Sequence, residues 1–355
     1  MKELEVIALL KENRGGLSHL AFNEAKSRGR KNKADSDSWM YELVEPFIID
    51  QQKIELSKAW RRLAYKTQVF SLQFNPHVRT RLSHTQEVIS IAALGAYILG
   101  LNVDLCVSIA KAHDVGHLPF GHVGERFMSH VTGNNFDHAA YGAVVLQEIE
   151  RGGEANFSFE TLEGVIYHSG KAIPETKPEE YKLVYWADKI AYVSHDINDA
   201  VRKGFLGALP KKIILFGATQ RERIKRCLLA LLVESIETGR ISFDHSFQAR
   251  LFRAVREWLF ENVYRKIDDA PCFNMLDAVY SFLERESRKE GSIFFGLDPA
   301  ILLSLTTDWE CWRFYQSLIS NSQNPAADLG VSEIVSSLRG KKIDWKKPDF
   351  SWAER

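Results

Sequence analysis

The chain has 355 residues, and its 46 basic and 46 acidic side chains give a formal net charge of zero. This balance argues against a protein coated throughout with basic residues for nucleic acid, although local basic patches remain open. Hydrophobic residues make up 45% of the chain, enough for a sizeable core. No apolar run approaches the ~20 residues of a membrane span.

Cysteine usage and the first residues bear on the compartment. Residues 1–5 lack the charged-then-apolar pattern of a secretion signal. The cysteines are far apart and form neither a C-x-x-C pair nor a disulfide framework; they are Cys106, Cys227, Cys272 and Cys311. We therefore expect a soluble, reduced, cytoplasmic protein with no membrane partner.

In chain order, the sequence predicts an N-terminal loop followed by a series of helices. Residues 14–38 are polar and rich in Gly, Ser, Lys and Asp, which predicts a loop. Helical spacing of apolar residues begins at Phe47 and continues through Leu56, Trp60 and Leu63. Further helices are predicted over 88–99, 105–113, 124–130, 136–150, 159–168, 178–203, 213–238, 247–266 and 275–288.

The helical periodicity decides the fold class. Alternating apolar and polar residues with turn signals are almost absent, so we expect few strands and an all-α protein. Residues 321–330 form a polar break, and the stretch after them is irregular. Composition suggests an N-terminal polar segment (1–46), a catalytic core (47–205) and a helical accessory C-terminal region (206–355).

The run from His113 to His122 is the most informative part of the sequence. It holds His113, Asp114, His117 and His122 within ten residues. His113 falls on the apolar face of its predicted helix, in register with Leu105 and Ile109. One helix end does not use so many titratable groups for packing alone, whereas a metal ion and a charged substrate would.

Two distant residues extend this run into a metal-binding series. His84 starts a predicted helix, and Asp188 lies between the apolar Trp186 and Ile190 on another. A lone buried carboxylate is costly, so Asp188 needs a cationic partner. Alone, His84 is more often a surface or core histidine and Asp188 a salt-bridge partner. The series as a whole favours a divalent metal ion, and mixed N/O ligation suits Mn, Fe, Co, Ni or Zn, and Mg less well.

At this point the chain resembles a known family, the HD-domain phosphohydrolases. Within them it resembles the dGTPase-type deoxynucleoside triphosphate triphosphohydrolases, over roughly residues 27–203. The resemblance is carried by residues 58–70, 79–84, 113–122 and 187–192. It implies an HD-domain helical fold with a helical C-terminal extension, and the hydrolysis of deoxynucleoside triphosphates (dGTP-like) to deoxynucleoside and inorganic triphosphate. It also implies one divalent metal ion, with His84, His113, Asp114 and Asp188 as its ligands.

A histidine–acid pair follows the metal series. His122 and Glu125 are three residues apart on a predicted short helix and so share a face. The matching pair in the family is catalytic, and His117 and His138 match family positions near the phosphates. The sequence leaves open whether His122 acts as an acid or assists the attacking group. The alternative is an ordinary surface pair.

The resemblance also implies substrate contacts. Arg81 and Lys189 are candidates for the triphosphate, and Gln68 matches a position near the sugar and base. Tyr192 and Asp196 share a helix face with Asp188 and match residues that contact the sugar. The alternatives are a solvated position for Lys189, where many relatives have a second acid, and ordinary packing for Tyr192.

Two other functions compete with this one. The first is an HD hydrolase acting on another nucleotide phosphoester, such as a monophosphate or cyclic nucleotide. The second is a nucleotide-sensing or nucleic-acid-binding protein without turnover. The resemblance further implies a homo-oligomer, with a nucleotide effector or single-stranded DNA as possible regulators. The aromatic cluster within residues 308–315 is expected in the core or at a subunit interface.

Overall fold

A computed structural model describes residues 3–71, 75–170, 172–320, 325–341 and 343–354. Within these ranges the chain is helical, and its pairing between extended segments is confined to two isolated β-bridges, Arg30 with Ser158 and Thr67 with Thr80. The all-α prediction is therefore confirmed. None of the helices in the described part of the chain is both long and apolar enough to cross a bilayer.

The α-helices follow one another along the chain without any intervening sheet. Their bounds are α1 Glu3–Glu12, α2 Pro46–Glu55, α3 Lys58–Arg62, α4 Arg81–Leu99, α5 Val103–Ala112, α6 His122–Thr132, α7 His138–Val144, α8 Phe159–Tyr167, α9 Glu179–Arg202, α10 Lys211–Phe216, α11 Gln220–Thr238, α12 Phe247–Asn262, α13 Ala270–Arg288, α14 Pro299–Ser304, α15 Asp308–Ile319 and α16 Val335–Leu338.

Several predicted helices start or break elsewhere, because polar groups cap them. The helix expected to run on from Phe47 stops at Glu55, and Leu56 is 61% exposed. The Ser57 hydroxyl accepts from the Trp60 N–H and starts α3. The helix predicted over 213–238 is likewise divided into α10 and α11, because the Thr219 side chain caps α11.

Two further boundaries bear on the functional site. The helix expected over 124–130 already begins at His122 as α6, directly after Gly121 at φ 56°. The helix expected over 136–150 begins at His138, where the Asp137 carboxylate accepts from the N–H groups of Ala139 and Ala140. His122 and His138 are thus the first residues of their helices: a positive-φ glycine precedes His122, and a side-chain cap precedes His138.

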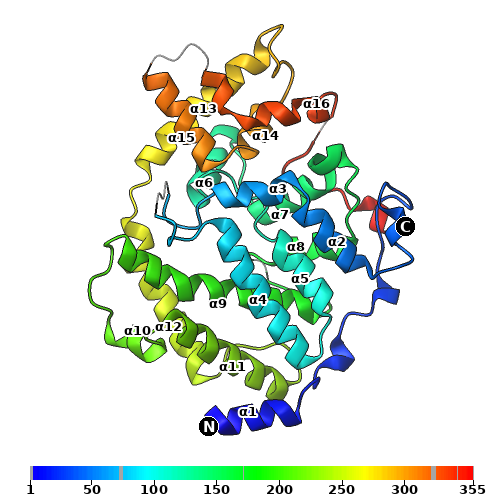
Figure 1. The fold of residues 1–355 in the computed structure, drawn as a ribbon, viewed down its shortest axis with the longest axis vertical. Coiled ribbons are helices and arrows are strands. Elements are labelled where there is room, and N and C mark those ends of the chain that lie inside the picture. The colour runs from blue at the N-terminus through cyan, green and yellow to red at the C-terminus, as the bar shows by residue number, and fades with distance from the viewer. Residues whose placement is uncertain (1–2, 72–74, 171, 321–324, 342, 355) are drawn as a thin grey trace.

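The buried apolar residues form two cores. The first lies among α4, α5, α9, α11 and α12, which pack against one another in the central and lower parts of Figure 1. The second lies among α6, α7, α13, α14 and α15 towards the upper end. Each core takes residues from both sides of position 205, so residues 206–355 complete both cores. The proposed division into domains stays a prediction.

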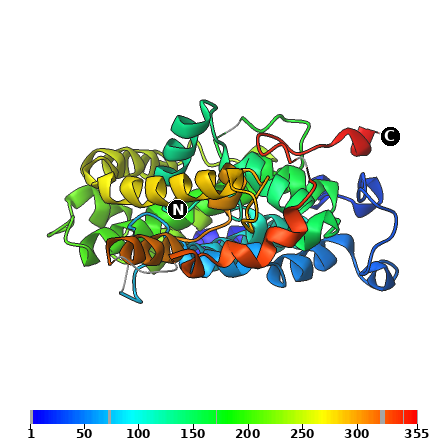
Figure 2. The same cartoon turned by 90° about the horizontal axis from the view of Figure 1, so that it is seen from above.

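The two ends of the chain differ in their surroundings. Helix α1 packs against α11, at the lower end of Figure 1. The last residues and part of the N-terminal polar segment both lie at the right edge in Figure 1 and in Figure 2. The Phe350 and Phe159 rings pack together with centroids 5.0 Å apart, and the Arg28 guanidinium lies 4.5 Å from the centre of the Phe159 ring. The four cysteines are free and buried.

Candidate metal centre and active site

Helix starts and one tight turn bring the predicted metal ligands together. Thr80 begins α4 with a reciprocal cap to Ser83, and this places His84 in the first turn with no exposed surface. His113 ends α5, and Asp114 follows it in the turn towards α6. Asp188 lies in the middle of α9, which packs against both α4 and α5.

The atoms that could bind a metal ion converge closely. His84 Nε2 lies 3.3 Å from His113 Nε2 and 3.1 Å from Asp188 Oδ1. Asp114 Oδ2 lies 3.4 Å from His113 Nε2 and 3.8 Å from His84 Nε2. All four side chains are buried. The structure therefore brings together the four residues that the sequence proposed as ligands.

Polar partners hold each imidazole on the side away from the cluster. The Ala110 carbonyl oxygen lies 2.7 Å from His113 Nδ1, so this nitrogen carries a proton and donates to it. His84 Nδ1 lies 3.0 Å from His195 Nε2, and His195 Nδ1 lies 2.9 Å from Asp196 Oδ1. These contacts orient His84 Nε2 and His113 Nε2 towards each other at 3.3 Å.

The electrostatics of this cluster favour a cation. Burial would raise the pKa of Asp114, but His113 and Arg81 hold it well below its usual range. Burial would also raise the pKa of Asp188, but the positive charge of Lys189 keeps this pKa well below its usual range. Burial lowers the pKa of His84. Two charged carboxylates and two imidazoles match the donor set of a divalent metal site.

Glu125 is the centre of a second cluster. Its carboxylate accepts from His122 Nδ1 at 2.8 Å and from His138 Nδ1 at 2.5 Å. His117 Nδ1 lies 3.6 Å away, and His117 Nε2 is 3.1 Å from Asp114 Oδ1. The His122 side chain is 67% exposed, whereas the other members of the cluster are shielded. The cluster thus leads from the metal ligands to one solvent-accessible imidazole.

Asp114, His117 and His138 also lie close enough to suggest a second metal site. The imidazole rings of His117 and His138 are stacked, with centroids 3.7 Å apart and planes 18° from parallel. A metal ion must lie in the plane of each imidazole that binds it, and nearly parallel planes at this spacing share no such point. This stacking argues against a second metal ion bound by His117 and His138 together.

The predicted substrate residues lie around the cluster with partners of their own. Arg81 is buried and donates to Asp114 Oδ2 at 3.0 Å and to the Gln68 carbonyl at 3.2 Å. Lys189 Nζ is 2.9 Å from Asp188 Oδ2, so it is not the solvated lysine of the alternative interpretation. Both cations that were expected to contact phosphate are therefore already paired with candidate metal ligands.

Tyr192 and Asp196 contact residues from the C-terminal region. The Arg256 guanidinium donates to the Tyr192 hydroxyl at 2.5 Å. The Tyr264 hydroxyl donates to Asp196 Oδ2 at 2.6 Å, and Asp196 is buried. This side of the site therefore includes residues of α12 and of the turn after it.

The sequence analysis missed four residues that contact the site. His195 is seven positions after Asp188 on α9, so helical spacing alone could have placed it on that face. His168 was left out, yet its Nε2 lies 3.2 Å from His138 Nε2. Arg256 and Tyr264 carry no local signal, because each meets α9 only through the tertiary fold.

Comparison with known proteins agrees with this geometry. The HD-domain family model matches residues 81–193. A deoxyguanosinetriphosphate triphosphohydrolase-like protein of Clostridium tetani is 36% identical over 252 residues, covering 67% of this chain and 71% of the relative. Its counterpart in Caldanaerobacter subterraneus is 36% identical over 252 residues, covering 70% and 72%. The chain belongs to the deoxyguanosinetriphosphate triphosphohydrolase-like family of HD-domain proteins.

Membership makes the chain a phosphohydrolase with a His/Asp cluster able to hold a metal ion. A relative named deoxyguanosinetriphosphate triphosphohydrolase-like protein 1, from Deinococcus radiodurans, is 40% identical over 169 residues, 44% of this chain and 45% of the relative. The HD match ends at residue 193, so Asp196, Arg256 and Tyr264 lie beyond it.

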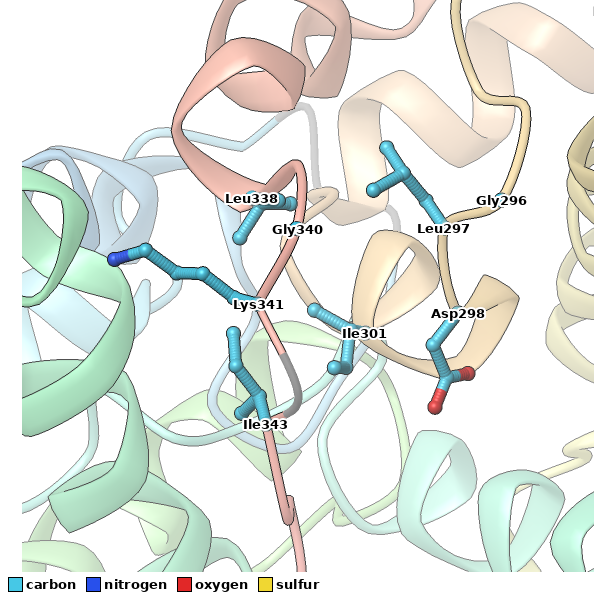
Figure 3. Close-up of a pocket in the computed structure, with 8 residues that line it drawn as sticks. All are labelled: Gly296, Leu297, Asp298, Ile301, Leu338, Gly340, Lys341 and Ile343. Carbon is cyan, nitrogen blue, oxygen red and sulfur yellow. The ribbon is translucent and has the colours of Figure 1, made fainter.

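A separate cavity of about 340 Å³ lies between the residues around α14 and the segment after α16. Figure 3 shows Ile301, Leu338 and Ile343 around it, with the Lys341 and Asp298 side chains directed outward. Its described lining residues include neither a histidine nor an aromatic ring. The chemistry of a phosphohydrolase is therefore better supported at the histidine cluster.

A substitution at Gly116 would test the tight packing of the turn between α5 and α6. A Cβ atom at this position would lie 2.1 Å from the His138 carbonyl oxygen and 2.3 Å from the Gly142 nitrogen. Because backbone atoms cannot yield cheaply, Gly116→Ala should lower the free energy of unfolding by about 3 kcal/mol. Gly207 has open space around it, so Gly207→Ala should change stability by less than about 0.5 kcal/mol. Equal effects in denaturant titrations would contradict this packing.

Proposed function

We propose that the protein hydrolyses deoxynucleoside triphosphates, dGTP-like in particular, to deoxynucleoside and inorganic triphosphate. The observation that carries this proposal is the junction of two clusters. A candidate metal centre shares Asp114 with a Glu125-centred histidine cluster that reaches solvent at His122. Family membership supports the same chemistry.

The residues present fit one divalent ion. His84, His113, Asp114 and Asp188 would hold it, and Arg81 and Lys189 would fix the orientation of the two carboxylates. Bound there, such an ion supplies Lewis acidity to the α-phosphoryl group. The donor set is compatible with Mn, Fe, Co, Ni or Zn, and with Mg less well, so metal identity is left to add-back experiments.

We propose that side chains of the protein carry out the proton transfers of the reaction. Hydrolysis forms a bond from a water oxygen to the α-phosphorus and breaks the bond to the 5′ oxygen, which must gain a proton. His122 is accessible and oriented by Glu125, so we assign it the proton transfer that accompanies attack by water and departure of the 5′ oxygen. His117 and His138 lie between Glu125 and Asp114, where imidazole N–H groups can stabilise negative charge on phosphate oxygens.

Substrate binding would draw on the surrounding residues. We propose that Arg81 and Lys189 contact the triphosphate while staying close to their carboxylates, since each guanidinium or ammonium has further N–H donors. Tyr192 and Asp196 are proposed to contact the sugar, and Gln68 the sugar or base. The Gln68 side-chain oxygen is buried without a hydrogen-bond partner, so a ligand donor could satisfy it.

Product analysis is the direct test of this function. Purified protein with Mn²⁺ should release inorganic triphosphate and deoxyguanosine from dGTP, and should cleave GTP at least about tenfold more slowly if Tyr192 and Asp196 read the sugar. Each deoxynucleoside triphosphate should be assayed alone and in pairs, because pairing exposes nucleotide activation. A monophosphate and a cyclic nucleotide belong in the same panel. Release of orthophosphate alone, or equal cleavage of GTP, would contradict the proposal.

His113→Ala tests the metal centre. This change removes one facing imidazole, so bound metal should fall from about one ion per chain to less than about a tenth, and kcat should fall about a thousandfold or more. Metal content is measured by elemental analysis after chelation and reloading. His130 is exposed on α6, and His130→Ala should leave metal content and kcat unchanged. A His113→Ala variant that still binds a full equivalent of metal would rule out this ligand set.

Glu125→Gln tests the second cluster. It keeps the shape of the side chain but removes the charge that orients His122 and His138, so kcat should fall about a hundredfold or more with metal content unchanged. The matched control is Glu148→Gln. The Glu148 carboxylate lies 3.1 Å from Lys31 Nζ and is not part of the histidine cluster. Normal turnover by Glu125→Gln would remove this cluster from the mechanism.

A further inference from the structure

The turn that carries His117 and His122 is held in an unfavourable backbone conformation. Between them, Phe120 has φ 59°, and Gly121 has φ 56° with ψ −122°. A bulky side chain is disfavoured at positive φ, and such a residue persists only where its surroundings hold it in place. The Phe120 side chain is buried in the second core. The backbone of this turn therefore needs a partner.

Asp308, the first residue of α15, is that partner. Its Oδ1 accepts from the Phe120 N–H at 2.8 Å. Its Oδ2 accepts from the Thr67 N–H at 2.9 Å and from the Thr67 hydroxyl at 2.6 Å. Asp308 is 3% exposed, so these bonds form away from water, where a lost partner is costly.

Lys66 makes a second link at the same place. Its buried ammonium group donates to the His117 carbonyl and to the Ser304 carbonyl, the latter at 3.2 Å. The segment from Ser304 to Asp308 thus holds the turn at two points: Lys66 links Ser304 to the His117 carbonyl, and the Asp308 carboxylate bonds the Phe120 N–H. The start of α15 is itself fixed, because Thr307 and Glu310 form a reciprocal cap.

We propose that Asp308 is a positioning residue for the reaction, holding the 117–122 turn so that His117 and His122 meet Glu125 in the productive geometry. This inference rests on the proposed function. It assigns Asp308 a part in catalysis although Asp308 is not among the residues proposed to hold the metal or contact the substrate. The HD match ends more than a hundred residues before Asp308, at residue 193.

Asp308→Asn is the first test, performed on the full-length protein. The amide is nearly isosteric, but it has only one oxygen acceptor, so either the Phe120 or the Thr67 bonds are lost. Metal content should be unchanged, KM should stay within about twofold, and kcat should fall about tenfold to a hundredfold through misplacement of the imidazole. The ring signals of His122 in histidine-labelled NMR spectra should shift.

Glu234→Gln is the matched control. Glu234 is a buried carboxylate in the C-terminal half, and it accepts from the Ser242 hydroxyl and from the N–H groups of Asp244, His245 and Ser246. Its loss should reduce stability without moving kcat or the His122 signals. If Asp308→Asn lowers activity only as far as Glu234→Gln does at equal folded fraction, Asp308 has a structural role and the proposal is wrong.

Thr67→Val provides a second variant in case Asp308→Asn does not fold. It removes one of the bonds to Asp308 and leaves the Phe120 bond, so it should change kcat and the His122 signals in the same direction by a smaller factor. Unchanged His122 signals in both folded variants would overturn the proposal. The His122 signals do not depend on turnover. They therefore test whether Asp308 positions the 117–122 turn even if the protein cleaves no deoxynucleoside triphosphate.

Discussion

The arrangement of this protein depends on two imidazoles that face each other beside two buried carboxylates. His113 Nδ1 donates to the Ala110 carbonyl and His84 Nδ1 lies beside His195, so the Nε2 atoms of His84 and His113 face each other at 3.3 Å. Asp114 and Asp188 add negative charge where water is excluded. Buried carboxylates need cationic partners; Arg81 and Lys189 supply part of that charge, and a bound metal ion would supply the rest.

The surrounding helices position the four side chains of this cluster. Capping by Thr80 starts α4 where it brings His84 inward, α9 supplies Asp188, and the end of α5 supplies the His113–Asp114 pair. Arg81 donates to Asp114 Oδ2, the oxygen that also faces the two imidazoles, whereas Lys189 donates to the outer oxygen of Asp188. The same two cations are the proposed triphosphate contacts, so metal binding and substrate binding share their charges.

The sequence was informative where chemistry is local. His84, His113, Asp114 and Asp188 could be grouped because together they form a His, His-Asp and Asp series that matches the family motif. The structure brings His84, His113 and Asp114 into one group, and Asp188 joins it through His84 at 3.1 Å. The break at Ser57 was missed because the apolar spacing continues through it. There the Ser57 hydroxyl and the distant Glu150 carboxylate accept from the first N–H groups of α3 and so start a new helix. Contacts from Tyr264 and Asp308 were beyond reach, since no periodicity links residues so far apart in the chain.

Anomalous diffraction from crystals of the protein loaded with Mn²⁺ tests the central claim most directly. We predict one strong peak per chain, within about 2.3 Å of a donor atom of each of His84, His113, Asp114 and Asp188. A peak bound by other side chains, or full occupancy at a place that leaves His84 and Asp188 uncoordinated, would contradict the account.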